Sequence, residues 1–196
     1  MIKKALILEY FTVGYNIIEG VVSVLVGLAA GSVALVGFGL DSFVESLSGV
    51  IMIWRLEKCD SVCKEEEEKS EKRAVKLIGL TLFILAGYVL YESLKKLLIK
   101  EIPEPTIFGI IIAFVSIIIM IPLFFLKNKI GKAQRMESLI SDAKQTIACV
   151  FLSCAVLLGI GLNYLFGFWW ADPLAALIIV AFLVEEGLAA LQKGEL

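Results

Sequence analysis

Two acidic residues, Asp41 and Glu45, stand four positions apart in an apolar stretch. They are the only charged residues between positions 33 and 54. An i, i+4 spacing puts both side chains on one side of a helix. A charge at the centre of a bilayer costs at least about 2.5–3.5 kcal/mol, so such residues face a cavity or a partner. Two neighbouring carboxylates repel each other when both are ionised, so the pair favours a bound cation or a shared proton. The alternative is that the acids only satisfy nearby hydroxyl groups and each other between packed helices.

A second polar face is expected later in the chain. Asp142, Gln145 and Cys149 occupy positions i, i+3 and i+7, which fall on one side of a helix. The two helices run in opposite directions, so we expect Glu45 to lie near Gln145. By the same reasoning, Asp41 lies near Cys149. Each residue of this face also has an ordinary interpretation: Cys149 as a small buried hydrophobe, Gln145 as an interhelical hydrogen-bonding residue and Asp142 as a solvated group near the membrane rim.

Other ionisable groups add to this pattern. Glu19 lies midway along the first apolar stretch. Lys144 either extends to the membrane interface or neutralises a carboxylate of the site. Cys59 and Cys63 precede a glutamate run at 65–68, and such a pair could collect soft or borderline metal ions. The stronger interpretation of that run is a solvated charged face.

The composition is that of a membrane protein. The chain has 196 residues, of which 59% are hydrophobic and 19% charged, against roughly 45–50% and 25% in soluble domains. A net charge of -2 excludes a nucleic-acid binder that depends on bulk positive charge. The sequence has no histidine, which excludes imidazole chemistry. Its four cysteines are too few for a disulfide scaffold. It has no G-x-x-x-x-G-K-[ST] loop, which argues against ATP-driven transport by this chain.

We predict an all-α, polytopic membrane protein formed by a single transmembrane domain over residues 1–196, because a helical span needs about 20 mostly apolar residues. Gly31 and Ser32 are placed at a tight turn, with Ser32 as the cap of the second helix. Asp172 and Pro173 would be the cap and first position of the sixth helix. The expected six-helix bundle has helices at about 5–29, 32–55, 74–98, 106–126, 135–163 and 171–190.

The distribution of lysine and arginine predicts the orientation. Positive residues are concentrated at the N-terminus, at 55–73 and at 127–135, and the positive-inside rule then places both termini in the cytoplasm. The first apolar stretch contains two glutamates and is followed by no small-residue cleavage site, so we interpret it as a retained helix. The expected location is the cell (plasma) membrane, crossed several times.

The chain resembles the transmembrane domain of the cation diffusion facilitator (cation efflux) family over nearly all its length. The motifs that carry the resemblance are GSVAL at 31–35, DSFVE at 41–45, SDAKQTIAC at 141–149 and WADPLAAL at 170–177. Residues 16–20 further resemble short bacterial members without the cytoplasmic domain. Transmembrane protein 163, a zinc-binding relative, is a more distant likeness.

The resemblance implies a tetrahedral metal site made by two residues of helix two and two of helix five. Carried over by position, these ligands are Asp41, Glu45, Gln145 and Cys149. Three of them depart from the family pattern: Glu45 replaces an aspartate, Gln145 a histidine and Cys149 a second aspartate. Glutamine is a weak zinc ligand.

Further residues are candidates for an additional metal or proton site because the ligand set departs from the pattern. They are Glu19, Asn16 and Asp142. The family's histidine-rich loop and its cytoplasmic domain are absent from the sequence, so a homodimer would have to form through the helices.

These features together predict a divalent metal cation transporter that exports a zinc-like ion by proton antiport. Carboxylate and thiolate ligands suit zinc or cadmium, and iron, cobalt and manganese remain open. The ion is cargo, and no cofactor is expected. The alternative function is a non-transporting metal-binding modulator or partner subunit. An enzyme is not expected, because no acid/base constellation fits.

Overall fold

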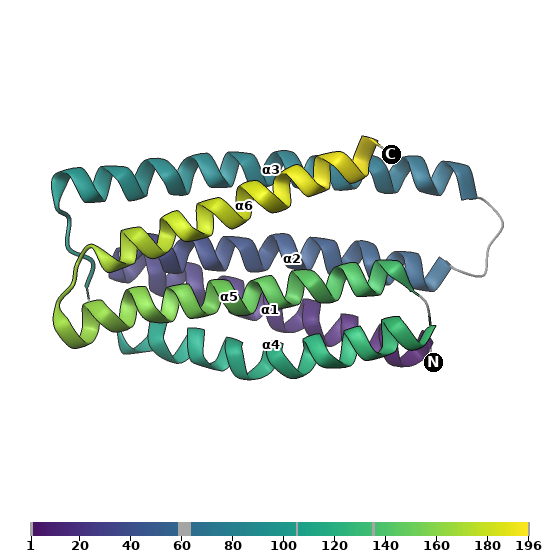
Figure 1. Cartoon of the computed structure of the whole chain (residues 1–196), viewed down its shortest axis with the longest axis horizontal. Helices are drawn as coiled ribbons and strands as arrows, with labels where there is room; N and C mark the ends of the chain where they lie inside the picture. Colours follow the sequence, from purple (N-terminus) through teal and green to yellow (C-terminus); the bar gives the residue numbers. More distant parts are fainter. Residues whose placement is uncertain (1, 59–63, 105, 135, 196) are drawn as a thin grey trace.

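The described residues of the structure, a computed structural model, form six antiparallel helices in one bundle (Figure 1). The structure describes residues 2–58, 64–104, 106–134 and 136–195. Cys59 and Cys63, the predicted loop metal-capture pair, lie outside the described residues. The helices are α1 (Ile2–Ala30), α2 (Val33–Lys58), α3 (Lys64–Ile99), α4 (Ile107–Gln134), α5 (Glu137–Phe166) and α6 (Ala171–Glu195).

The helices form three closely packed pairs, α1 with α2, α3 with α6 and α4 with α5. Helix α2 also contacts α3, α5 and α6, so it is the central helix of the bundle. Both chain termini lie toward one end of the bundle (Figure 1). We call this the terminal end, and we call the opposite end, where α1 turns into α2, the far end.

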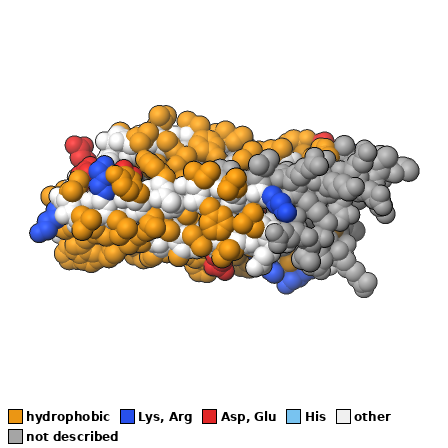
Figure 2. All heavy atoms as spheres, turned by 90° about the horizontal axis from the view of Figure 1, so that it is seen from above, with side chains coloured by type: hydrophobic (Ala, Val, Ile, Leu, Met, Phe, Trp, Pro, Cys, Tyr) orange, Lys and Arg blue, Asp and Glu red, His pale blue; other side chains and the backbone are white. Residues whose placement is uncertain are grey.

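The expected fold class is confirmed. Five of the six described helices, all except α3, are long and apolar enough to cross a membrane. Large hydrophobic side chains, among them Leu25, Ile84, Phe125 and Leu158, are exposed. Hydrophobic side chains cover much of the face of the bundle shown in Figure 2. Such an exposed apolar surface is compatible with lipid as the surrounding solvent.

Helix boundaries differ most from the prediction at α3 and α4. Helix α3 begins at Lys64, about ten residues earlier than expected. Its first turns are a run of glutamate and lysine, which favour helix intrinsically. Helix α4 continues to Gln134 instead of ending near 126, and this extension places Lys127 inside a helix.

The turn between α1 and α2 confirms one predicted cap and corrects another. Gly31 has a positive φ of 62°, which glycine adopts without strain. The Ser32 hydroxyl oxygen accepts a hydrogen bond from the Leu35 N–H at 3.1 Å, as a capping residue does. Asp172, expected to cap its own helix, instead accepts the Val33 N–H at 3.0 Å and the Ser32 hydroxyl proton. It therefore joins the start of α6 to the start of α2.

Helices α1 and α2 approach each other closely at two glycines. A Cβ added to Gly39 would lie 2.8 Å from Ser23 Cβ and 2.9 Å from the Gly20 backbone oxygen. Only glycine fits such a contact, because backbone atoms cannot move aside as a flexible side chain can. This approach aligns the polar residues of α1 with those of α2.

We expect Gly39→Ala to lower the stability of the bundle by about 1–3 kcal/mol, because the added methyl group overpacks the α1–α2 contact. The apparent melting temperature in detergent measures the effect. Gly161→Ala is the matched control: nothing lies within 4 Å of its added Cβ, and alanine favours helix by up to about 1 kcal/mol. Equal melting temperatures for the two variants would contradict the close approach.

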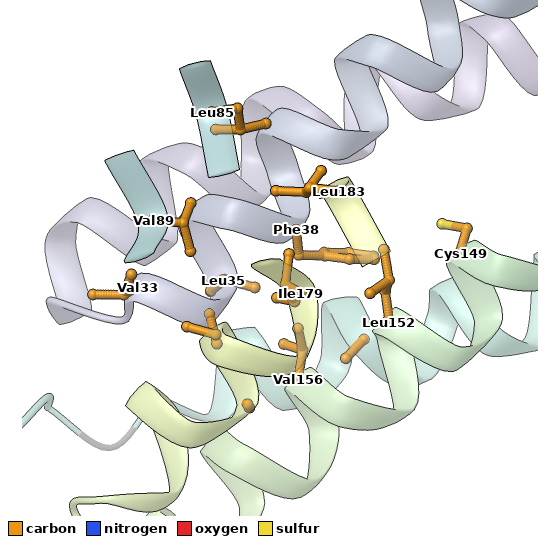
Figure 3. Packing of buried hydrophobic residues seen from close by; sticks show 14 of the residues in the cluster. Val33, Leu35, Phe38, Leu85, Val89, Cys149, Leu152, Val156, Ile179 and Leu183 are labelled. Carbon is orange, nitrogen blue, oxygen red and sulfur yellow. The ribbon is translucent and has the colours of Figure 1, made fainter. Parts of the chain in front are cut away.

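A hydrophobic cluster fills the bundle between α2, α3, α4, α5 and α6 toward the far end. Figure 3 shows its packing, which includes Leu35, Phe38, Val89, Leu152, Val156 and Ile179. Cys149 belongs to the same cluster. Of the α5 residues labelled in Figure 3, it lies nearest the terminal end. The core therefore borders the polar interior described next.

Candidate functional site

A polar stripe on α1 faces the interior of the bundle. Its members recur at helical spacing and are all at most 4% exposed: Glu9, Thr12, Asn16, Glu19 and Ser23. Polar groups in a membrane helix are costly and usually face the bundle interior or a cavity. The stripe therefore marks an interior polar layer beside α2, α4 and α5.

Glu19 is held at the centre of this layer by hydroxyl donors. Tyr15 donates a hydrogen bond to Glu19 Oε1 at 2.8 Å, and Ser42 of α2 donates to Glu19 Oε2 at 3.0 Å. Both carboxylate oxygens of Glu19 thus have partners. The sequence signal for Glu19 was its position in an apolar stretch, whereas Tyr15 and Ser42 were not singled out.

Glu45 lies against α5. The Thr146 hydroxyl group is 3.3 Å from Glu45 Oε1 and equally far from the backbone oxygen of Asp142. The other carboxylate oxygen, Glu45 Oε2, is buried without a hydrogen-bond partner in the described part of the chain. The Cys149 thiol is close enough to Glu45, Glu19 and Asp41 to interact with their charges.

Asn16 sits opposite Glu45 across the α1–α2 contact. Val13 packs against Gly49 and Glu19 bonds to Ser42, and this antiparallel register places Asn16 level with Glu45. Asn16 is fully buried, and neither its Oδ1 nor its Nδ2 has a partner among the described residues. Buried polar atoms are nearly always satisfied by protein, water or ligand. The unsatisfied atoms of Asn16 and Glu45 thus indicate a place for a bound species between α1, α2 and α5.

The remaining predicted ligands are spread over different surroundings. Asp41 is 5% exposed and lies within electrostatic reach of Glu186 on α6 as well as of Glu45. Gln145 is only half-buried, and Lys144 is exposed. Among the residues that the structure describes, no three His, Cys, Asp or Glu side chains converge closely enough to hold a metal ion. The four-ligand site therefore stays a prediction, and closure around an ion would require side-chain movement.

A buried ion-pair cluster lies nearer the terminal end, and the sequence did not reveal it. Lys127 Nζ is 3.2 Å from Glu9 Oε2 and 2.5 Å from Asp142 Oδ2. Lys127 was assigned to a connection because the fourth helix was expected to end at 126. The signal that could have found Glu9 is its place on the α1 stripe, seven residues before Asn16.

Comparison with known proteins adds a family match and several relatives. A family model described as the cation efflux transmembrane domain matches residues 10–194. The magnetosome protein MamB of Magnetospira sp. (strain QH-2) is 26% identical over 91% of this chain and 61% of its own length. The cation-efflux pump FieF of Shewanella oneidensis is 24% identical over 84% of this chain and 57% of its own length. Transmembrane protein 163 of Xenopus laevis is 22% identical over 96% of this chain and 66% of its own length.

The chain spans about three fifths of the length of the first two relatives. The match falls on the membrane helices, which are also the part of this chain that carries the buried polar layer.

Proposed function

The chain belongs to the cation efflux transmembrane domain family, and on that premise we propose that it transports divalent metal cations out of the cytoplasm through a site between α2 and α5. The proposed ligands are Asp41, Glu45, Gln145 and Cys149. The observation that carries the proposal is Glu45, a buried carboxylate with one oxygen that has no partner among the described residues, next to a buried thiol. Such a pair is suited to a cation and poorly suited to an empty apolar interior.

Zinc is the proposed ion. Zinc binds thiolate and carboxylate ligands in four-coordinate sites, and Glu45 and Cys149 supply one of each. Cadmium, iron, cobalt and manganese are the other candidates. The Asn16 amide, which has no hydrogen-bond partner in the described part of the chain, supports a further contribution from α1. Glu19 and Asp142 are the additional acidic candidates for metal or proton binding.

We propose proton antiport as the energy source. Ligands must lose their protons to bind metal, so metal binding and protonation of the same groups compete. Without histidine, the proton carriers are the buried carboxylates or the Cys149 thiol. In this structure the hydrophobic cluster extends from Cys149 toward the far end, and the cluster of Glu9, Lys127 and Asp142 lies toward the terminal end. Alternating access then requires the helices to open at one end at a time.

Two further features follow from the same proposal. The distribution of lysine and arginine supports a cytoplasmic position for both termini. The proposed membrane is the plasma membrane. A homodimer would form through the lipid-facing helix surfaces, and crosslinking in membranes tests that state.

Zinc uptake into liposomes that contain the purified protein tests the function. We expect uptake to rise when the liposome interior is made acidic, because exit of protons drives entry of metal, and to fall when a protonophore removes the gradient. An internal fluorescent zinc indicator provides the measurement. Uptake that ignores the gradient would exclude antiport.

Uptake no faster than in protein-free liposomes would exclude transport by this chain alone. The second candidate function, a metal-binding modulator or partner subunit, would then be favoured. The departures of Glu45, Gln145 and Cys149 from the family's ligand pattern favour it.

A further inference from the structure

A lysine is fully buried between two carboxylates from two other helices. Lys127 on α4 is 1% exposed, Glu9 on α1 is 0% exposed, and the Asp142 side chain on α5 is 7% exposed. The ammonium group lies 3.2 Å from Glu9 Oε2 and 2.5 Å from Asp142 Oδ2. Three helices thus converge on one cation that the chain itself provides.

The charges of this cluster do not sum to zero, and the hydrogen bonding of Glu9 is incomplete among the described residues. Two carboxylates around one ammonium leave one surplus negative charge when all three groups are ionised. Glu9 Oε1 is buried and has no hydrogen-bond partner in the described part of the chain. A buried charge is costly unless it is paired and hydrogen-bonded. A divalent cation would balance both carboxylates, whereas the single charge of Lys127 does not.

The cluster lies directly on the terminal-end side of the candidate site. Asp142 is one helical turn before Thr146, whose hydroxyl group contacts Glu45. Lys127 and Asp142 are both near enough to Glu45 to interact with its charge. On α2, Gly49 faces Glu9: a Cβ added there would lie 3.7 Å from Glu9 Oε2. The charged groups around the cluster therefore come from α1, α2, α4 and α5.

We propose that Glu9 and Asp142 form a second divalent-cation site, in which the Lys127 ammonium occupies the place of the metal ion in this structure. An arriving ion displaces the ammonium, and the flexible four-carbon stem of lysine allows the group to withdraw. The ammonium returns when the ion moves on toward Glu45. Lys127 thereby acts as a tethered competitor that sets how much metal is needed to load the site. Only the onward step depends on the proposed function, because binding at Glu9 and Asp142 does not require transport.

Counting bound ions in the purified full chain tests the proposal. Protein stripped with a chelator is dialysed against Zn²⁺ in detergent, and metal per chain is measured by elemental analysis. At Zn²⁺ concentrations too low to displace the ammonium of the parent, we expect Lys127→Met to bind one more Zn²⁺ per chain than the parent. Adding Glu9→Gln and Asp142→Asn to that variant should remove the extra ion. Lys129→Met, an exposed lysine of the same helix, should bind as many ions as the parent.

A folded Lys127→Met protein that binds no additional ion would overturn the proposal. If that variant does not fold, the parent provides the measurement. Acetylation of Lys127 by acetic anhydride, read by mass spectrometry, should increase several-fold when saturating Zn²⁺ displaces the ammonium, while acetylation of Lys129 stays constant. Unchanged Lys127 labelling would overturn the proposal as well. Failure of the proposed function is a separate result, because it appears as an absence of zinc uptake and leaves the difference in ion count intact.

Discussion

The Asp41→Ala/Glu45→Ala double variant is expected to take up zinc into liposomes at less than about one hundredth of the parent rate. Loss of groups that merely orient metal ligands costs about 10–100-fold in affinity or activity, and loss of two ligands should cost more. Both residues are buried, at 5% and 4% exposure. Replacing both acids with alanine introduces no new buried charge. The variant should therefore fold, with an elution volume like that of the parent.

Glu57→Ala is the matched control for the double variant. Glu57 lies on the same helix, is exposed and accepts a hydrogen bond from Tyr10 at 2.6 Å, outside the polar interior. We expect it to transport at the parent rate. Parent-like transport by the Asp41→Ala/Glu45→Ala protein would show that the cation binds elsewhere.

Cys149→Ser is expected to change which ions bind. Thiolate prefers soft ions, and a hydroxyl group is a much weaker ligand for them. We expect cadmium affinity to fall at least about tenfold, equivalent to about 1.4 kcal/mol, while manganese affinity stays within a few-fold of the parent. Isothermal titration of the purified protein with each ion measures both values.

Cys154→Ser provides the comparison for this selectivity. Cys154 lies on the same helix, is half-buried and packs against the hydrophobic cluster. It should leave the preference for cadmium over manganese unchanged. If Cys149→Ser also leaves it unchanged, Cys149 is a core residue and not a ligand.

The fold could be predicted from the sequence because the bilayer imposes a length and an apolar composition on each span. The turn at Gly31 and the cap at Ser32 followed from local chemistry and are confirmed. The role of Asp172 was wrong because its partner is Val33 of another helix, and no local pattern shows which helix end lies beside a carboxylate. The start of α3 was missed because a highly charged run was interpreted as solvated loop although its residues favour helix.

The polar interior was only partly visible in the sequence. Glu19, Asp41 and Glu45 stood out because each lies in an apolar stretch. Lys127 did not, because a lysine at the edge of an apolar segment normally extends to the interface. Its burial depends on Glu9 and Asp142, which are far away in the chain and meet it only through packing of α1, α4 and α5. Whether such a lysine is buried depends on contacts between helices, and the hydropathy of a single segment does not reveal those contacts.

Anomalous scattering from zinc or cadmium bound to the crystallised protein would locate the ion. We expect a peak between α2 and α5, about 2.0–2.2 Å from a Glu45 oxygen and about 2.3 Å from Cys149 Sγ for zinc, with loss of the peak in the Asp41→Ala/Glu45→Ala variant. A fully occupied ion bound only outside this region, with Glu45 and Cys149 unchanged, would contradict it.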